Sequence, residues 1–159
     1  MKLRYNRLLF LILSLFVFND FLFAKNMPVR NQDVSPAQLQ KQNTEIVQLV
    51  AKEESKNLPQ KIDKYTTITS IKAKGTALIY TFEINAAPKS DEAVIKEDHS
   101  RMQKAVTRGV CKNSRRFMNA QIKKIYVYKS AVSKRKLFEF VIDQDACIKL
   151  FGLEYSLNN

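Results

Sequence analysis

Glycine, histidine and cysteine are scarce in this chain of 159 residues, which contains three, one and two of them, and tryptophan is absent. A glycine-rich loop that cradles phosphate groups needs several closely spaced glycines, so nucleotide sites of that kind are excluded. Two cysteines and His99 are too few for an ordinary zinc site, and neither a Cys-x-x-Cys motif nor a nucleophile elbow occurs. We therefore expect no cofactor, no metal and no enzymatic activity. A small hydrolase of an unrecognised type is the alternative, and His99 is interpreted as an exposed helix residue.

The first 24 residues have the composition of a secretory signal. Lys2, Arg4 and Arg7 give a cationic start, residues 8–18 are almost entirely apolar, and the segment ends at Ala24. A helix that spans a bilayer needs about 20 apolar residues, and this run is shorter. The pattern predicts a cleaved signal peptide at residues 1–24 and export to the periplasm or the medium, with an uncleaved anchor as the alternative. Residues 25–34 predict a flexible lead, and residues 35–159 have the length of a single α+β domain.

The two cysteines, Cys111 and Cys147, lie well inside the expected domain. In an oxidising compartment an isolated pair of cysteines most simply forms a disulfide. We therefore predict one Cys111–Cys147 disulfide that ties the end of a long helix to the segment after the last strand.

Hydrophobic periodicity and capping residues predict the secondary structure. Ser35 before Pro36, Ser90 before two acids, and Asp143 are typical residues at the start of a helix. Helices are expected at residues 35–56, 90–112 and 115–120 and after residue 143, and strands at 65–73, 76–85, 122–129 and 137–142. The predicted fold class is α+β, a four-stranded antiparallel sheet packed with helices in the order α-β-β-α-β-β with a further α at the end. Residues 137–142 are apolar at nearly every position, which predicts a central strand covered on both faces.

The chain is strongly basic, with a formal net charge of +12. One group of cations, which we call the basic row, recurs at intervals of three or four residues and so shares one side of a helix. Its members are Arg101, Lys104, Arg108, Lys112 and Arg115. The basic row is a candidate site for an anionic partner such as a polymer or a lipid, and the alternative is an ordinary solvated helix face. Nucleic acid is not favoured, because aromatic residues for base stacking are not interleaved with these cations.

The order of several short motifs resembles that of small exported bacterial proteins, including pilotins of type II secretion systems of the AspS type. The motifs are Leu58-Pro59, Asp63, Thr66-Thr67, Ile79-Tyr80-Thr81-Phe82, Cys111, Tyr126-Val127-Tyr128 and Cys147. The resemblance implies an antiparallel sheet flanked by helices and a domain that binds the C-terminal helix of a secretin. Those pilotins are lipoproteins, whereas no cysteine lies at the expected cleavage site here, so a lipid anchor is not implied.

These observations predict a non-enzymatic periplasmic or secreted binding domain. We expect it to be an accessory or partner-binding factor of a cell-envelope or secretion assembly, with an envelope protein as its partner. The alternative is an exported effector or inhibitor that binds an anionic ligand through the basic row. The salt dependence of partner binding distinguishes the two hypotheses, because binding through exposed charges weakens as ionic strength rises.

Overall fold

The computed structural model describes residues 34–157. The expected signal peptide, and all but the last residue of the expected lead, lie outside the described residues. Three helices begin at the predicted caps, because in each case a side-chain oxygen accepts a backbone N–H that lacks a helical partner. Ser35 caps α2 (Pro36–Glu54) in a capping box with Gln38. Ser90 caps α3 (Asp91–Asn113), and Asp143 caps α5 (Gln144–Phe151).

The strands form one five-stranded sheet whose spatial order follows the sequence order. They are β1 (Gln60–Lys61), β2 (Thr66–Lys74), β3 (Ala77–Ile84), β4 (Lys123–Ser130) and β5 (Lys136–Ile142). A short 3-10 helix, η2 (Ser55–Asn57), leads from α2 into β1. The α+β class is confirmed, and the expected strands are all present within a residue or two of their predicted bounds.

The expectation of a four-stranded, wholly antiparallel sheet is wrong in two respects. The two-residue strand β1 adds a fifth strand, and β3 pairs with β4 in parallel, so the sheet is mixed. Parallel neighbours need a long crossover connection, and here it consists of α3 and α4 (Arg115–Asn119). The pairs β2–β3 and β4–β5 are antiparallel, as expected for strands joined by tight turns.

The strand at residues 137–142 is not central, as expected from its composition, but lies at an edge of the sheet. Along β5, Phe138, Phe140 and Ile142 are buried, whereas Glu139 and Val141 are exposed. Phe138, Phe140 and Ile142 therefore pack on one face of the sheet, whereas Val141 is accessible on the other. Leu137, next to an irregularity in the pairing with β4, is buried as well.

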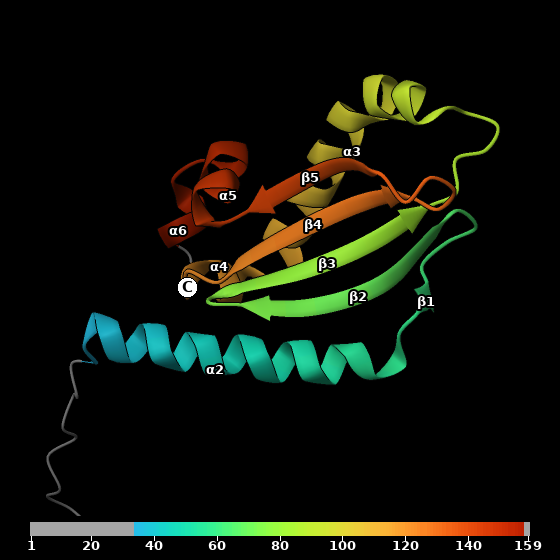
Figure 1. Cartoon of the computed structure of the whole chain (residues 1–159). Coiled ribbons are helices and arrows are strands. Elements are labelled where there is room, and N and C mark those ends of the chain that lie inside the picture. Colours follow the sequence, from blue (N-terminus) through green and yellow to red (C-terminus); the bar gives the residue numbers. More distant parts are fainter. Residues whose placement is uncertain (1–33, 158–159) are drawn as a thin grey trace, which may run out of the picture. The chain divides into compact units, whose positions relative to one another are not determined.

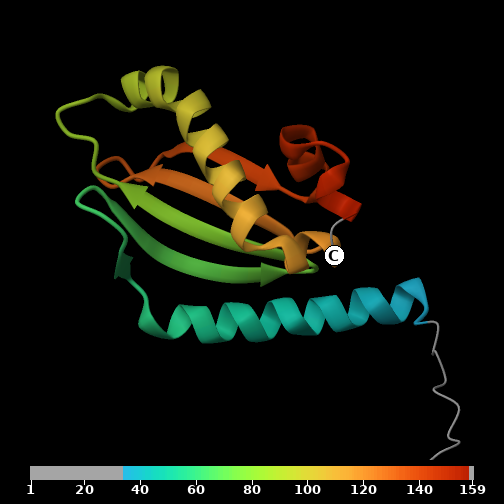
Figure 2. The ribbon, with the colours of Figure 1, turned by 180° about the vertical axis from the view of Figure 1, so that it is seen from behind.

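The helices lie on a single face of the sheet. In Figure 1 the sheet is seen with α3 behind it, and Figure 2, from the opposite side, shows α3 in front. Alternate residues of β3 that point to this face, Leu78, Tyr80, Phe82 and Ile84, are buried, whereas the residues between them are only half-buried. The buried core includes Val47 and Ala51 of α2 and Val94 and Val110 of α3. No helix within residues 34–157 is both long and apolar enough to cross a membrane.

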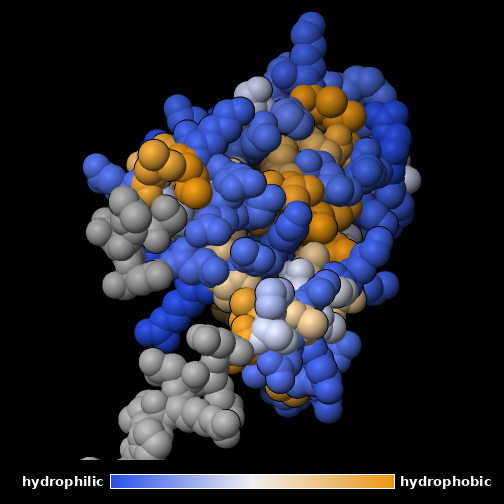
Figure 3. All heavy atoms as spheres, turned by 90° about the vertical axis from the view of Figure 1, so that its left-hand side faces the viewer, coloured by the Kyte–Doolittle hydropathy of each residue, from blue (hydrophilic) through white to orange (hydrophobic). Residues whose placement is uncertain are grey.

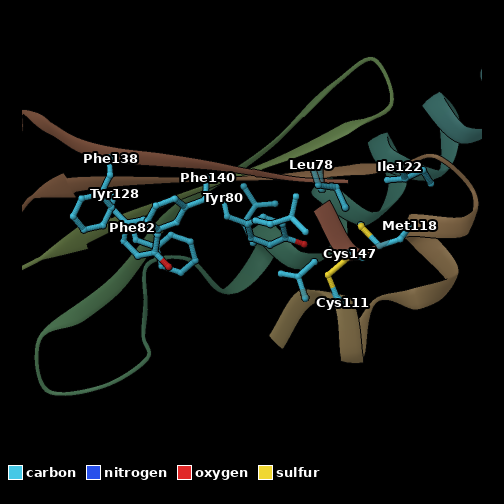
Figure 4. Close-up of a cluster of buried hydrophobic side chains, with 14 of the residues drawn as sticks. Leu78, Tyr80, Phe82, Cys111, Met118, Ile122, Tyr128, Phe138, Phe140 and Cys147 are labelled. Atoms are coloured by element: carbon cyan, nitrogen blue, oxygen red, sulfur yellow. A yellow bond between two sulfur atoms is a disulfide. The ribbon is translucent and has the colours of Figure 1, made fainter. Parts of the chain in front are cut away.

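The core has an aromatic part and a part that contains the disulfide (Figure 4). Stacked or tilted rings of Tyr80, Phe82, Tyr128, Phe138 and Phe140 lie on β3, β4 and β5. Beyond them the predicted Cys111–Cys147 disulfide joins the last turn of α3 to α5, with a Cα–Cα distance of 5.5 Å. The disulfide is confirmed, and α5 ends as expected at Gly152, whose φ of 85° suits a glycine. The last described helix is α6 (Glu154–Leu157).

Candidate functional site

Helix α2 exposes a row of large apolar side chains, which we call the α2 apolar edge: Leu39, Ile46 and Leu49. Their exposed fractions are 42%, 43% and 62%. The spacing i, i+7, i+10 places them along one side of the helix over about 15 Å of its length. Exposed apolar residues are individually normal, but a row of three on one helix indicates a surface that another molecule can cover.

The sequence pattern alone does not reveal the α2 apolar edge, because Leu39, Ile46 and Val47 recur at helical spacing and so predict a single apolar stripe. In the structure the buried side of α2 consists of Asn43, Val47 and Ala51. The Asn43 side chain donates a hydrogen bond of 2.7 Å to the backbone carbonyl of Ala120, just after α4. With Asn43 on the buried side of α2, Leu39 and Ile46 flank that side and remain accessible.

Helix α3 does not cover the α2 apolar edge. Helix α2 packs on β2 and β3, and α3 packs on β5, but within the described chain the two helices share almost no contact. On the sheet between them, Tyr126 is only half-buried and its ring stacks against those of Tyr80 and Phe82 at centroid distances of 5.1 and 5.5 Å. A partly accessible aromatic surface therefore lies on β3 and β4, between the strands that α2 and α3 contact.

A polar cluster fixes the end of α2 to the sheet. The Tyr80 hydroxyl donates a hydrogen bond of 2.8 Å to a Glu54 carboxylate oxygen. The Lys124 ammonium donates to the Ser114 hydroxyl at 2.9 Å and lies over the rings of Tyr80 and Phe117. Burial lowers the pKa of Lys124.

The tyrosines of this region are held in their neutral form. Burial, and then the nearby Glu54 carboxylate, raise the pKa of Tyr126 to about 12. Burial and the hydrogen bond to Glu54 also raise the pKa of Tyr80. A phenol with a raised pKa stays protonated at neutral pH and can donate a hydrogen bond but does not act as a base. The cluster is therefore suited to positioning α2, not to proton abstraction.

The structure brings together four of the five members of the basic row. Arg101, Lys104, Arg108 and Lys112 are exposed on α3, where they surround a shallow hollow floored by Ala105 and Gly109. Arg101 pairs with Asp98 at 2.7 Å, and the other three form no ion pair within residues 34–157. Lys104, Arg108 and Lys112 can therefore contact an anionic surface without first losing a partner among the described residues, whereas Arg101 would give up or share its contact with Asp98.

Arg115, the fifth member, does not continue the row. Helix α3 ends at Asn113, and Arg115 begins α4 on a new axis. It is half-buried, its guanidinium lies 4.7 Å from the centre of the Tyr155 ring, and it donates a hydrogen bond to the Tyr155 carbonyl at 2.9 Å. Its contacts are therefore those of a residue that packs α6 against α4. Anion binding by the other four members stays a prediction.

His99 differs from the expected exposed residue. It is half-buried, and its ring meets those of Phe138 and Phe140 edge-on, with centroid distances of 5.8 and 5.3 Å. It thus helps to pack α3 on β5. No group of three or more metal-ligating side chains occurs among residues 34–157.

No protein-family model matches the sequence, and no curated protein matches it. Three solved structures share its fold. A protein from Pseudomonas aeruginosa described as secreted has a TM-score of 0.61 at 17% identity, covering 69% of this chain and 96% of its own. The type 2 secretion pilotin EpsS from Vibrio vulnificus has a TM-score of 0.59 at 10% identity, covering 70% and 96%. The type II secretion pilotin AspS from Vibrio cholerae has a TM-score of 0.56 at 15% identity, covering 70% and 97%. The chain is thus similar in fold to the pilotins whose motifs its sequence resembles.

Proposed function

We propose that this chain is an exported, non-enzymatic binding domain that serves as an accessory factor of a secretion assembly in the cell envelope. The shared fold with two pilotins supports the class of function. The predicted signal and the disulfide support export.

The observation that carries the proposal is the α2 apolar edge. A helix of the partner that carries apolar residues at intervals of three and four would lie along Leu39, Ile46 and Leu49, as in other helix-binding surfaces. Covering three such side chains removes apolar area from water, which is favourable whatever the ionic strength. The polar cluster around Glu54 keeps α2 in place while the partner binds. We propose that the partner segment is an apolar helix of an envelope secretion protein.

The test is affinity capture from a detergent-treated envelope fraction of the source bacterium, using the exported protein as bait. Ile46→Asp/Leu49→Asp places charge on the α2 apolar edge, and Gln40→Asp/Gln48→Asp, at exposed positions of the same helix, is the matched control. We expect one envelope protein to be captured by the parent and the control, to resist 0.5 M salt (roughly a 4 Å screening length), and to be lost with Ile46→Asp/Leu49→Asp. Equal capture by all three baits would contradict the proposal.

A second function is favoured by one observation, the unpaired cations of the basic row. We propose as the alternative that the chain is an effector or inhibitor that binds an anionic ligand through Arg101, Lys104, Arg108 and Lys112. Arg101→Gln/Lys104→Gln/Arg108→Gln should then abolish the salt-sensitive part of binding and leave the urea midpoint nearly unchanged, because exposed charges contribute little to stability. Binding that is as tight as the parent's at low salt would leave the basic row as a solvated surface.

A further inference from the structure

The face of the sheet that carries no helix forms a second, separate surface, which we call the open sheet face. Its centre consists of Ile79, Ile125, Val127 and Val141. Ile79 is aligned with Ile125, and Ile125 with Val141, across β3, β4 and β5. In Figure 1 this face is turned toward the viewer, opposite α3. Val141 is 49% exposed, and the other three are half-buried, as expected for a sheet face without a covering layer in the described chain.

Lysines surround these aliphatic residues. Lys72 is aligned with Ile79, Lys74 and Lys123 are both aligned with Ala77, and Lys129 is aligned with Glu83, so all four lie on the open sheet face. Lys72, Lys74 and Lys129 form no ion pair with any described residue. Lys123 has only Asp143, at 3.9 Å.

The two acids of this face are already neutralised by other lysines. Glu83 pairs with Lys134 at 2.9 Å, and Glu139 pairs with Lys136 at 3.3 Å. The open sheet face therefore presents an excess of positive charge around an aliphatic centre. Figure 3 shows a different side of the domain, the left-hand side of Figure 1, where apolar atoms also lie among hydrophilic ones.

We propose that the open sheet face binds an anionic phospholipid surface. The four cations aligned with this face across the strands are all lysines, and Arg135 of the adjoining turn is paired with Asp91 and Glu92. Lysine is a flexible point charge that attracts phosphate without demanding a fixed geometry, which suits a fluid layer of headgroups. A sheet face is broad, so several lysines reach such a layer at once while the aliphatic centre faces it.

This surface lies on the opposite side of the sheet from the helices, so the proposal stands or falls independently of the α2 apolar edge and of the basic row. Each lysine near an anionic membrane strengthens binding about fivefold at moderate salt. Removal of three lysines from the open sheet face should therefore weaken binding about 100-fold, and added salt should weaken the parent's binding steeply.

The test is co-sedimentation of the exported protein with vesicles of phosphatidylglycerol and phosphatidylcholine in equal parts, compared with vesicles of phosphatidylcholine alone. Lys72→Gln/Lys74→Gln/Lys129→Gln is compared with Arg101→Gln/Lys104→Gln/Arg108→Gln, which removes the same charge from α3. We expect the sheet variant to lose about 100-fold in partitioning and the helix variant only a few-fold, with unchanged urea midpoints for both. Equal losses would reduce the effect to net charge and overturn the proposal. Absence of any preference for anionic vesicles would also overturn it and favour an acidic protein as the occupant.

A spectroscopic probe reports which face touches the lipid. Because the chain lacks tryptophan, Val141→Trp places a single indole on the open sheet face, and Gln103→Trp places one at an exposed position of α3 as the control. We expect the emission of the Val141→Trp protein to shift to shorter wavelength on anionic vesicles and to be quenched by brominated acyl chains, and that of the control to do neither. The opposite pattern, or a water-like indole at position 141 in sedimented protein, would overturn the proposal.

Discussion

Reduction of the Cys111–Cys147 bond should remove a large share of the stability of this domain. The two cysteines are 36 residues apart in the sequence, and a closed loop of that length lowers the entropy of the unfolded chain by an amount equivalent to about 4 kcal/mol. Both side chains are almost completely buried, at 1% and 0% exposed, and a buried thiol packs as a small apolar group. Loss of packing on reduction is therefore small, and the loop term dominates. Because the free energy of unfolding of a whole domain is about 5–15 kcal/mol, the reduced protein should retain only a small margin of stability.

The assay is urea unfolding at pH 7, followed by circular dichroism, with and without a reductant and with the thiol count verified by mass. For an m-value of about 1.5 kcal/mol/M, the midpoint should fall by roughly 2–3 M on reduction. The Cys111→Ala/Cys147→Ala variant is the control, because its midpoint should not respond to the reductant. A fully reduced parent whose midpoint moves by less than about 0.5 M would refute the loop-entropy reasoning and show that the segment between the cysteines is compact even when unfolded.

Three further predictions concern the polar cluster and the N-terminus. Tyr80→Phe removes the hydrogen bond to Glu54, and because Glu54 is exposed and can rehydrate, the free energy of unfolding should fall by about 1 kcal/mol in urea titrations; a loss above about 3 kcal/mol would point to a larger role for the hydroxyl. The pKa of Tyr126 is raised to about 12 in the folded protein, so the unfolded chain loses this proton at a lower pH. The contribution of Tyr126 to the free energy of unfolding should therefore be fully present below pH 10 and decline between pH 10 and 12. A urea midpoint that stays constant over that interval would contradict the assignment. Intact-mass analysis of the exported protein should find an N-terminus near Lys25, and the mass of all 159 residues would instead indicate a retained anchor.

Local features of the fold could be read from the sequence, and long-range ones could not. The caps at Ser35, Ser90 and Asp143 depend on one side chain and the backbone beside it, so the helix starts were predictable. The parallel pairing of β3 with β4 depends on where α3 and α4 return the chain, and the alternation of residues 122–129 is the same in either direction. Strand β1, with two residues, is too short to leave a periodic signal.

The candidate surfaces show the same division. The spacing of Arg101, Lys104, Arg108 and Lys112 placed them correctly on one helix side, but Arg115 was included because nothing in the spacing marks the break after Asn113. The α2 apolar edge was hidden for a different reason. A hydrophobic stripe indicates a side of a helix, and the contact between Asn43 and Ala120, distant in sequence, decides which part of that side is buried.

Helix α2 lies outside the segment that the disulfide closes, and this has a consequence for how the domain opens. Its attachment depends on a few buried residues, on Asn43 and on the Tyr80–Glu54 contact, and no covalent bond links it to α3 or α5. Local opening of α2 can therefore occur while the segment closed by the disulfide remains folded. The amide protons of α2 should then exchange with solvent earlier than those of β3 and β4. A partner that lies along Ile46 and Leu49 would suppress this local opening. Slower amide exchange in α2 would therefore report that the partner has bound.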